Sequence, residues 1–217
     1  QKKMKIKVLL VSLVSAVFAV AQNQDQRAEN LLEDVSKTLA SYTNIAIDFS
    51  YELINRKEYI KQKEQGTLVV QDNKYLLNLM GIQQLSDGEN VHTINTENEE
   101  VLIEPVDTDS SEGLNPSKLF SFYKEGYRFS WDITQPLYGN RIIQFVKLTP
   151  IDTYAQAAYL LLGIDTKTKH IYKLIEVNDN GTETTLTVRS FTPNKNLASN
   201  VFVFSEADYP NYYIDRF

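Results

Sequence analysis

The hydrophobic positions of residues 28–39 recur with the period of an α-helix. Ala28, Leu31, Leu32, Val35 and Leu39 fall on one side of the cylinder, and charged residues occupy much of the rest. This pattern predicts a single helix whose apolar stripe must pack against another element. Asn44 lies beyond the end of that helix.

From residue 45 the period changes to two, which is typical of a strand with one apolar face. Ile45, Ile47, Phe49, Tyr51 and Leu53 are the apolar positions of the first such segment. Turn-forming residues divide the following chain into many short segments of the same kind. We predict eleven or twelve antiparallel strands, among them 59–63, 66–71, 74–80 and a last strand at 201–204.

Residues 115–126 carry the signals of a second, shorter helix. Asn115 and Pro116 are typical of a helix cap followed by proline at the first helical position, and Gly126 is typical of a helix end. Four large apolar residues lie on the predicted helix: Leu119, Phe120, Phe122 and Tyr123.

The order of these elements favours a mainly β fold with a few helices. There is no alternation of strands with helices and no internal repeat, so one large curved antiparallel sheet is the simplest architecture. Two short helices can cover only part of its apolar face. We therefore predict an unclosed barrel capped by a helical lid, with a β-sandwich as the alternative. Barrels of this kind tend to hold a ligand at the mouth.

Residues 4–21 have the three parts of a secretory signal peptide. Lys5 and Lys7 form a basic start, Val8 to Phe18 is apolar, and small residues end at Ala21. The apolar run has 11 residues, whereas a membrane-spanning helix needs ~20, which argues against an N-terminal anchor as the alternative. We expect cleavage after Ala21 and one exported, soluble domain at 22–217 in the periplasm.

Charge and cysteine usage narrow the class of partner. The chain has no Cys, so neither a disulfide nor an acyl anchor on cysteine is expected. Removing the signal peptide removes four lysines and no acid, which changes the formal net charge from −6 to −10. An acidic surface is repelled by nucleic acid and by anionic headgroups. We expect a monomer that does not bind nucleic acid.

No group of residues indicates catalysis, a cofactor or a metal. His92 and His170 lie in predicted strands, where a structural role is the commoner one, and no nucleophile or phosphate-binding motif is present. Asp107 to Glu112 contains part of a calcium-loop pattern but lacks its glycine and its late glutamate. We expect no enzyme activity, no cofactor and no metal site.

Stripes of aromatic and aliphatic residues are the candidate binding site. The stripes alone favour a plain dry core, but the shortage of covering elements favours a cavity that takes an apolar ligand. The candidate residues are Ile47, Phe49, Tyr51, Leu68, Val70, Tyr75, Leu77, Leu79, Leu119, Phe122, Tyr123, Phe129 and Trp131.

Several segments have the order and spacing of a known family. They are the opening helix with 42–45 (YTNI), 48–50 (DFS), 66–70 (GTLVV), Asp87-Gly88, 146–150 (VKLTP), 162–165 (LGID) with 170–174 (HIYKL), and 201–204 (VFVF). Together they resemble the periplasmic outer-membrane lipoprotein-carrier family (LolA), over the whole chain after the signal peptide.

The resemblance implies a chaperone in lipoprotein transport and outer-membrane biogenesis, which binds acyl chains in a hydrophobic cavity and shuttles them from the inner to the outer membrane. The implied partners are an acylated lipoprotein or a related amphiphile, an inner-membrane donor complex and an outer-membrane acceptor. A lipid-sensing regulatory protein of similar fold is the alternative. Where the family has an arginine that helps to latch the lid, the turn here reads Gln71-Asp72-Asn73-Lys74, so the means of latching is open.

Overall fold

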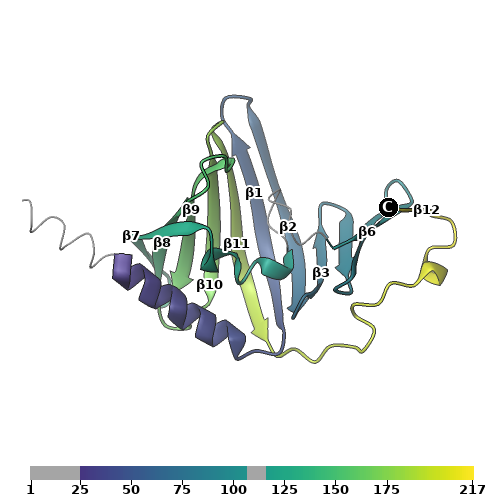
Figure 1. Ribbon diagram of the computed structural model, residues 1–217, viewed down its shortest axis with the longest axis horizontal. Coiled ribbons are helices and arrows are strands. Elements are labelled where there is room, and N and C mark those ends of the chain that lie inside the picture. The colour runs from purple at the N-terminus through teal and green to yellow at the C-terminus, as the bar shows by residue number, and fades with distance from the viewer. Residues whose placement is uncertain (1–24, 107–115) are drawn as a thin grey trace, which may run out of the picture.

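The chain forms one twelve-stranded sheet that curves around an N-terminal helix (Figure 1). The computed structural model describes residues 25–106 and 116–217. The strands are β1 (Ile45–Asn55), β2 (Ile60–Gln71), β3 (Lys74–Leu79), β4 (Ile82–Ser86), β5 (Asn90–Asn95), β6 (Glu100–Pro105), β7 (Tyr127–Leu137), β8 (Arg141–Pro150), β9 (Ala157–Asp165), β10 (Ile171–Asn178), β11 (Thr182–Pro193) and β12 (Tyr213–Arg216).

The strands follow one another in the order β12-β6-β5-β4-β3-β2-β1-β11-β10-β9-β8-β7. Neighbours are antiparallel, except that β12 runs parallel to β6. The two edge strands, β12 and β7, do not pair with each other, so the sheet stays open. The predicted unclosed barrel is confirmed, and the alternative of a sandwich is excluded because all the strands belong to one sheet.

Two of the sequence predictions fall on parts of the chain that lie outside the described residues. These are the signal peptide at 4–21, with its cleavage after Ala21, and the acidic segment from Asp107 to Glu112. In the part that the structure describes, no helix is both long and apolar enough to cross a membrane.

Residues 25–40 form the predicted N-terminal helix, because its five apolar residues all find a partner surface. Ala28, Leu31, Leu32, Val35 and Leu39 are buried in one core cluster with residues of the sheet. On the opposite side, Lys37 Nζ lies 2.7 Å from Glu33 Oε1, one helical turn away. We call the sheet face that packs against this helix the inner face and the opposite face the outer face.

The second predicted helix does not form. The structure has two 3-10 turns instead, η1 (Pro116–Lys118) and η2 (Phe122–Lys124). A segment this short is a marginal helix on its own, and its aromatic residues are poor helix formers. Contacts with the inner face therefore decide its conformation, and Phe120 packs edge-on against Phe191 of β11 with 6.1 Å between ring centroids.

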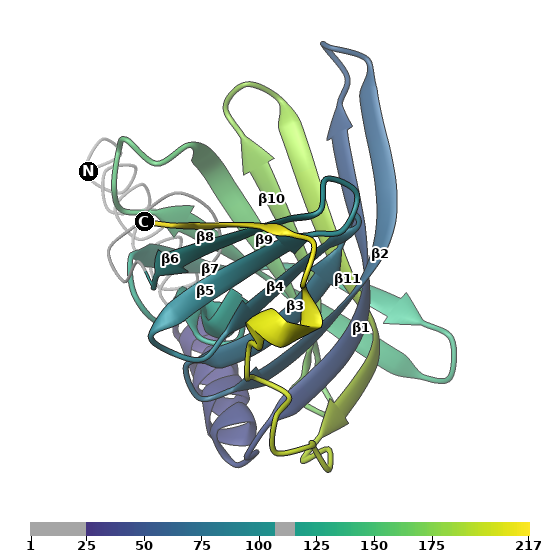
Figure 2. The ribbon, with the colours of Figure 1, turned by 90° about the vertical axis from the view of Figure 1, so that its right-hand side faces the viewer.

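The C-terminal segment differs most from the prediction. Residues 201–204 are not a strand. Phe202 is buried, and Phe204 stacks on His92 of β5 with 4.5 Å between ring centroids. The apolar residues of this stretch thus anchor residues 194–212, which we call the strap, to the sheet. Figure 2 shows the strap crossing the outer face of strands β3 to β6. The strap leads into β12, which the sequence analysis missed.

The predicted strands 59–63 and 66–71 are one continuous strand, β2. Gly66, near the join, lies beside Phe49 of β1 and Leu79 of β3. A Cβ atom on Gly66 would lie 2.4 Å from Cζ of Phe49 and 2.8 Å from the carbonyl oxygen of Asn78. This glycine makes room for an aromatic ring and does not mark a turn.

We expect Gly66→Ala to lower the free energy of unfolding by about 1–3 kcal/mol, the usual cost of overpacking. Phe49→Leu removes the ring that the new methyl group meets. The effect of Gly66→Ala in a Phe49→Leu background should therefore be smaller than in the wild type, as measured by urea denaturation of the four proteins. Equal effects in both backgrounds would contradict the proposed contact.

Candidate functional site

The inner face is the candidate site, because the structure brings all thirteen sequence-predicted residues together there. Each belongs to the main core cluster or packs against it. On β1 and β2 the alternation is in register: Ile47 lies beside Leu68, and Ile45 beside Val70. On β3, Leu77 continues the row from Leu68. These side chains therefore lie on the side of the sheet that faces the helix.

The thirteen residues divide into two groups by exposure. Seven are buried: Ile47, Phe49, Leu68, Val70, Tyr75, Leu119 and Tyr123. Six are half-buried: Tyr51, Leu77, Leu79, Phe122, Phe129 and Trp131. The first group is dry core, which is the plainer of the two roles considered for the stripes. The second group leaves apolar surface open to solvent around that core, and whether it binds a ligand stays a prediction.

The sequence analysis missed the part of the inner face that lies under the helix. Strands β8 and β9 supply five fully or almost fully buried residues there: Val146, Leu148, Leu160, Leu162 and Ile164. The alternation of apolar and other residues along these two strands is the sequence signal that could have revealed them. Phe191 of β11 was missed as well, and it packs between the helix end and the segment that follows η1.

Residues 116–126, which we call the covering segment, close the β1–β3 part of the inner face. Leu119, Phe120 and Tyr123 are buried in the core cluster. Phe122 packs edge-on against Tyr127 at the start of β7, with 6.0 Å between ring centroids. The backbone N–H of Ile151 donates to the carbonyl of Gly126 at 2.9 Å. The segment is therefore held mainly by apolar side chains.

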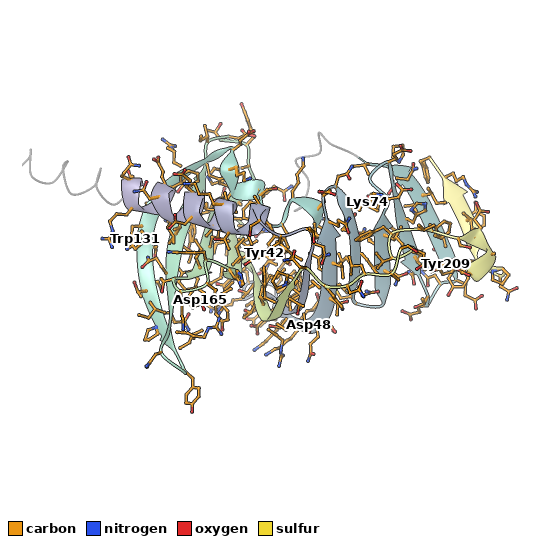
Figure 3. The ribbon with its side chains drawn as sticks, turned by 90° about the horizontal axis from the view of Figure 1, so that it is seen from below. Tyr42, Asp48, Lys74, Trp131, Asp165 and Tyr209 are labelled. Atoms are coloured by element: carbon orange, nitrogen blue, oxygen red, sulfur yellow. The ribbon has the colours of Figure 1, made fainter. Side chains whose placement is uncertain are left out.

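One side-chain hydrogen bond joins the covering segment to the helix. The hydroxyl of Tyr123 lies 3.1 Å from the hydroxyl of Ser36, and Tyr123 is only 1% exposed. Burial raises the pKa of Tyr123, and the bond to Ser36 offsets part of that rise. Lys74, at the start of β3, is exposed (Figure 3). The Tyr123–Ser36 pair thus ties the covering segment to the helix.

The helix is tied to the sheet near both of its ends. Near the start, the guanidinium of Arg27 lies 4.3 Å from the ring centroid of Trp131 on β7. Just beyond the other end, the hydroxyl of Tyr42 lies 2.9 Å from Nε2 of His170. These contacts fix the helix to the sheet in addition to its five buried apolar residues.

Tyr75 places a polar atom inside the apolar cluster. Burial raises the pKa of its hydroxyl to about 12, so the group is neutral at physiological pH. A hydroxyl in a mainly apolar site is the kind of group that orients a bound amphiphile.

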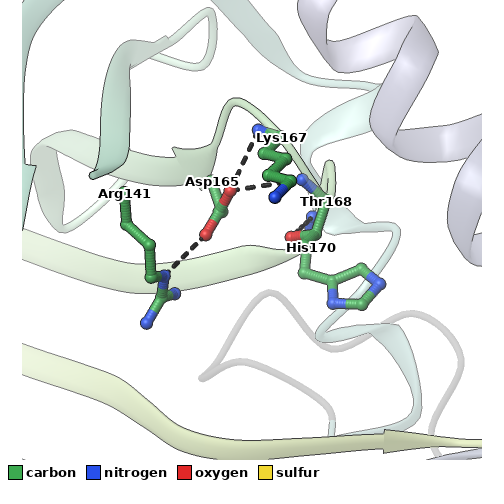
Figure 4. A network of polar contacts seen from close by, with 5 residues as sticks. All are labelled: Arg141, Asp165, Lys167, Thr168 and His170. Atoms are coloured by element: carbon green, nitrogen blue, oxygen red, sulfur yellow. Dashed lines mark hydrogen bonds and ion pairs between the residues drawn. The ribbon is translucent and has the colours of Figure 1, made fainter. Parts of the chain in front are cut away.

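The carboxylate of Asp165 organises the β9–β10 turn (Figure 4). It accepts hydrogen bonds from Nε of Arg141 at 2.8 Å and from the backbone N–H groups of Lys167 and Thr168 at 2.9 and 3.2 Å. Burial alone would raise the pKa of Asp165, but these donors outweigh it and hold that pKa below its ordinary value. A carboxylate whose partners are the turn backbone and an arginine of the neighbouring strand β8 is structural.

Both histidines are packed against aromatic rings. His170 stacks on Phe191 with 3.9 Å between ring centroids, and His92 stacks on Phe204. Burial lowers the pKa of His170, although the charge of Asp165 offsets part of the effect. Within the described residues, no group of three or more His, Asp or Glu side chains could hold a metal ion.

Comparison with known proteins identifies the fold. No protein-family model matches the chain, and no curated protein matches its sequence significantly. The solved structure of an uncharacterized conserved protein from Thermus thermophilus matches with a TM-score of 0.60 and 12% identity, over 88% of this chain and 99% of that one. At this identity the match shows a shared fold.

Two further solved structures are more distant. A LolA superfamily protein from Nitrosomonas europaea matches with a TM-score of 0.42 and 10% identity, over 82% of this chain and 97% of that one. A chain of the Pseudomonas aeruginosa MucA/MucB complex matches with a TM-score of 0.40 and 14% identity, over 80% of this chain and 61% of that one. Both TM-scores are below 0.5, so neither match carries an argument about this chain.

We expect acid to destabilise the protein partly through His170. Because the pKa of this ring is lowered in the folded state, the unfolded chain takes up the proton first as the pH falls. The stability that the neutral ring contributes is full above about pH 6.5, the ordinary histidine value, and declines below it. Melting temperatures measured between neutral and mildly acidic pH should fall less steeply in His170→Gln than in the wild type. An equal slope would show that His170 does not contribute.

Proposed function

We propose that this protein carries the acyl chain of a lipoprotein, or a similar apolar tail of an amphiphile, within the cell envelope. The observation that carries the proposal is a half-buried apolar rim around a core that the short covering segment closes, formed by Tyr51, Leu77, Leu79, Phe122, Phe129 and Trp131. The signal-peptide pattern and the resemblance to lipoprotein carriers support the location and the cargo.

Displacement of the covering segment would make room for the tail. The helix buries five apolar residues and has further contacts at both ends, whereas the covering segment buries three and has no regular helix. Exposing three large side chains costs roughly 1.5–3 kcal/mol each. An acyl chain of about ten methylenes offsets this cost at ~0.8 kcal/mol per CH₂.

The small difference between these two terms suits a carrier. A tail can take the place of Leu119, Phe120 and Tyr123 on the inner face. The free energy gained by burying the tail is then little larger than the free energy gained when those three side chains pack back. Binding and release then stay reversible, and a donor or acceptor membrane protein could tip the balance in either direction. Shuttling from the inner to the outer membrane is the role that fits this balance.

Leu77 and Leu76 offer a matched test, because they are neighbours on β3 and both are half-buried. Leu77 lies on the inner face with Leu68, and Leu76 lies on the outer face beside Leu85. We expect Leu77→Glu to fold but to bind dansyl-labelled undecanoic acid at least about tenfold more weakly, since the charge meets the tail. Leu76→Glu should bind like the wild type.

Equal binding by these two variants would contradict the assignment of the inner face. Phe49→Glu serves a different purpose, because Phe49 is 2% exposed and its replacement buries an unpaired carboxylate. That variant should unfold, as seen by circular dichroism.

Native mass spectrometry of protein purified from an envelope extract tests the cargo directly. Co-purified lipid or lipoprotein supports a carrier, and a stoichiometric protein without lipid supports the sensor alternative.

Tyr123→Phe tests whether the hydrogen bond between Tyr123 and Ser36 latches the covering segment to the helix. The loss of one neutral hydrogen bond costs about 1 kcal/mol, which shifts the equilibrium toward the displaced segment by roughly fivefold. Apparent affinity for the dansyl probe should rise by a similar factor, because the competent state is more populated. Ser36→Ala removes the same bond and should have the same effect, and the double variant should match either single one. An additive effect would show that the two hydroxyls act separately.

A further inference from the structure

The outer face carries a hollow, lined by polar and apolar residues, to which the proposed carrier function assigns no role. Its volume is about 790 Å³, and it extends over β1–β5 between β11 and the C-terminal strap. Asp48, Thr67 and Asn78 line it and alternate with the inner-face residues Phe49, Leu68 and Leu77. These three polar residues place the hollow on the outer face, and Phe49 and Leu79 of the apolar site also contribute to its lining.

Seven of the lining residues, among them Thr67, Asn78 and Gln83, have neutral polar side chains, and they lie beside apolar residues such as Met80 and Ile94. Nδ2 of Asn78 donates to the hydroxyl of Thr67 at 3.1 Å, and Nε2 of Gln83 donates to Oδ1 of Asn78 at 2.9 Å. These bonds fix the orientation of both amides. Each amide nitrogen keeps a second hydrogen, and the carbonyl oxygen of Gln83 keeps its lone pairs for a ligand.

The charge in the hollow is balanced. Asp48 and Arg189 are its two charged residues, and the carboxylate of Asp48 already accepts a hydrogen bond from the hydroxyl of Ser190. An anionic or cationic ligand would therefore find no excess of opposite charge. An acyl tail would leave the amides and hydroxyls without partners, which is costly.

An extended peptide also fits poorly. A peptide strand is recognised through free backbone groups at a sheet edge. Here the strands beneath the hollow are all interior to the sheet, and their ladders run from β11 through β1, β2, β3 and β4 to β5. Recognition must then come from side-chain amides and hydroxyls, whose natural complement is a ligand with many hydroxyl groups.

An aromatic ring on the strap completes the hollow. Tyr209, just after η3 (Glu206–Asp208), is half-buried and lines it. The ring is stacked on Phe204 with 5.4 Å between centroids, and Phe204 in turn is stacked on His92 of β5. Tyr209 is thus a supported platform against which the C–H face of a sugar ring can pack. Figure 3 shows Tyr209 and Asp48 on separate elements, the strap and β1.

We propose that this outer hollow binds a neutral sugar chain. Amide and hydroxyl groups of Thr67, Asn78 and Gln83 would hydrogen-bond to the sugar hydroxyls, and Tyr209 would pack against a ring. These polar groups lie on the outer face, so the protein could hold an apolar tail and a glycan on opposite sides of one sheet.

The test is titration of the mature protein with maltotetraose, cellotetraose and chitotetraose. Binding is measured by calorimetry and by saturation-transfer NMR. At least one should bind in the millimolar range or tighter. Asn78→Ala and Tyr209→Ala should each weaken that binding about tenfold, which corresponds to roughly 1.4 kcal/mol. Tyr213→Ala is the control, because Tyr213 is an exposed aromatic residue on β12 that does not line the hollow.

Thr67→Val keeps the shape of an exposed side chain and removes its hydroxyl, so it tests the hollow without risk to the fold. It should also weaken sugar binding while leaving the melting temperature unchanged. The proposal is overturned if none of the three tetrasaccharides binds at millimolar concentration. It is equally overturned if one binds and the variants at positions 67, 78 and 209 bind it as well as the wild type does.

Discussion

The burial of one apolar sheet face with too few covering elements is the constraint on which the rest of this structure depends. A twelve-stranded open sheet presents a large inner face, and one helix with five buried residues covers only part of it. The covering segment closes part of the remainder with Leu119, Phe120 and Tyr123. What is left is the half-buried rim that includes Leu77 and Trp131. In water such a rim is tolerable, but it favours any ligand that can bury it.

The helix and the covering segment are held to the sheet by different contacts, and this difference decides which of them is displaced first. The helix has a continuous stripe of five buried apolar residues, whereas the covering segment has two 3-10 turns and buries three. Local stability follows the number of buried apolar contacts. The segment should therefore yield first, even though Tyr123 is among the most buried residues of the chain.

The sequence predicted the helix and most of the strands because their periodicities are long and regular, as in Ile45 to Leu53. It failed where tertiary contacts override local preference. Pro116 and Gly126 are good helix boundaries, yet the aromatic residues between them pack individually and break the helix into turns. Val201 to Phe204 alternates like a strand, but its two phenylalanines anchor a strap. For the site, alternation indicated which side chains share a face, but only the structure separates dry core from open rim.

The same alternation that builds the inner face also creates the outer one, and the two cannot vary independently. Shifting β2 by one residue against β1 would exchange Thr67 with Leu68, and so would turn polar residues inward and apolar residues outward along the whole strand. Gly66 opposes such a shift, because only glycine fits under the ring of Phe49. One close contact therefore fixes the register on which both the apolar rim and the outer hollow rely. A sheet of this kind can evolve two chemically opposite sites, provided that this contact is kept.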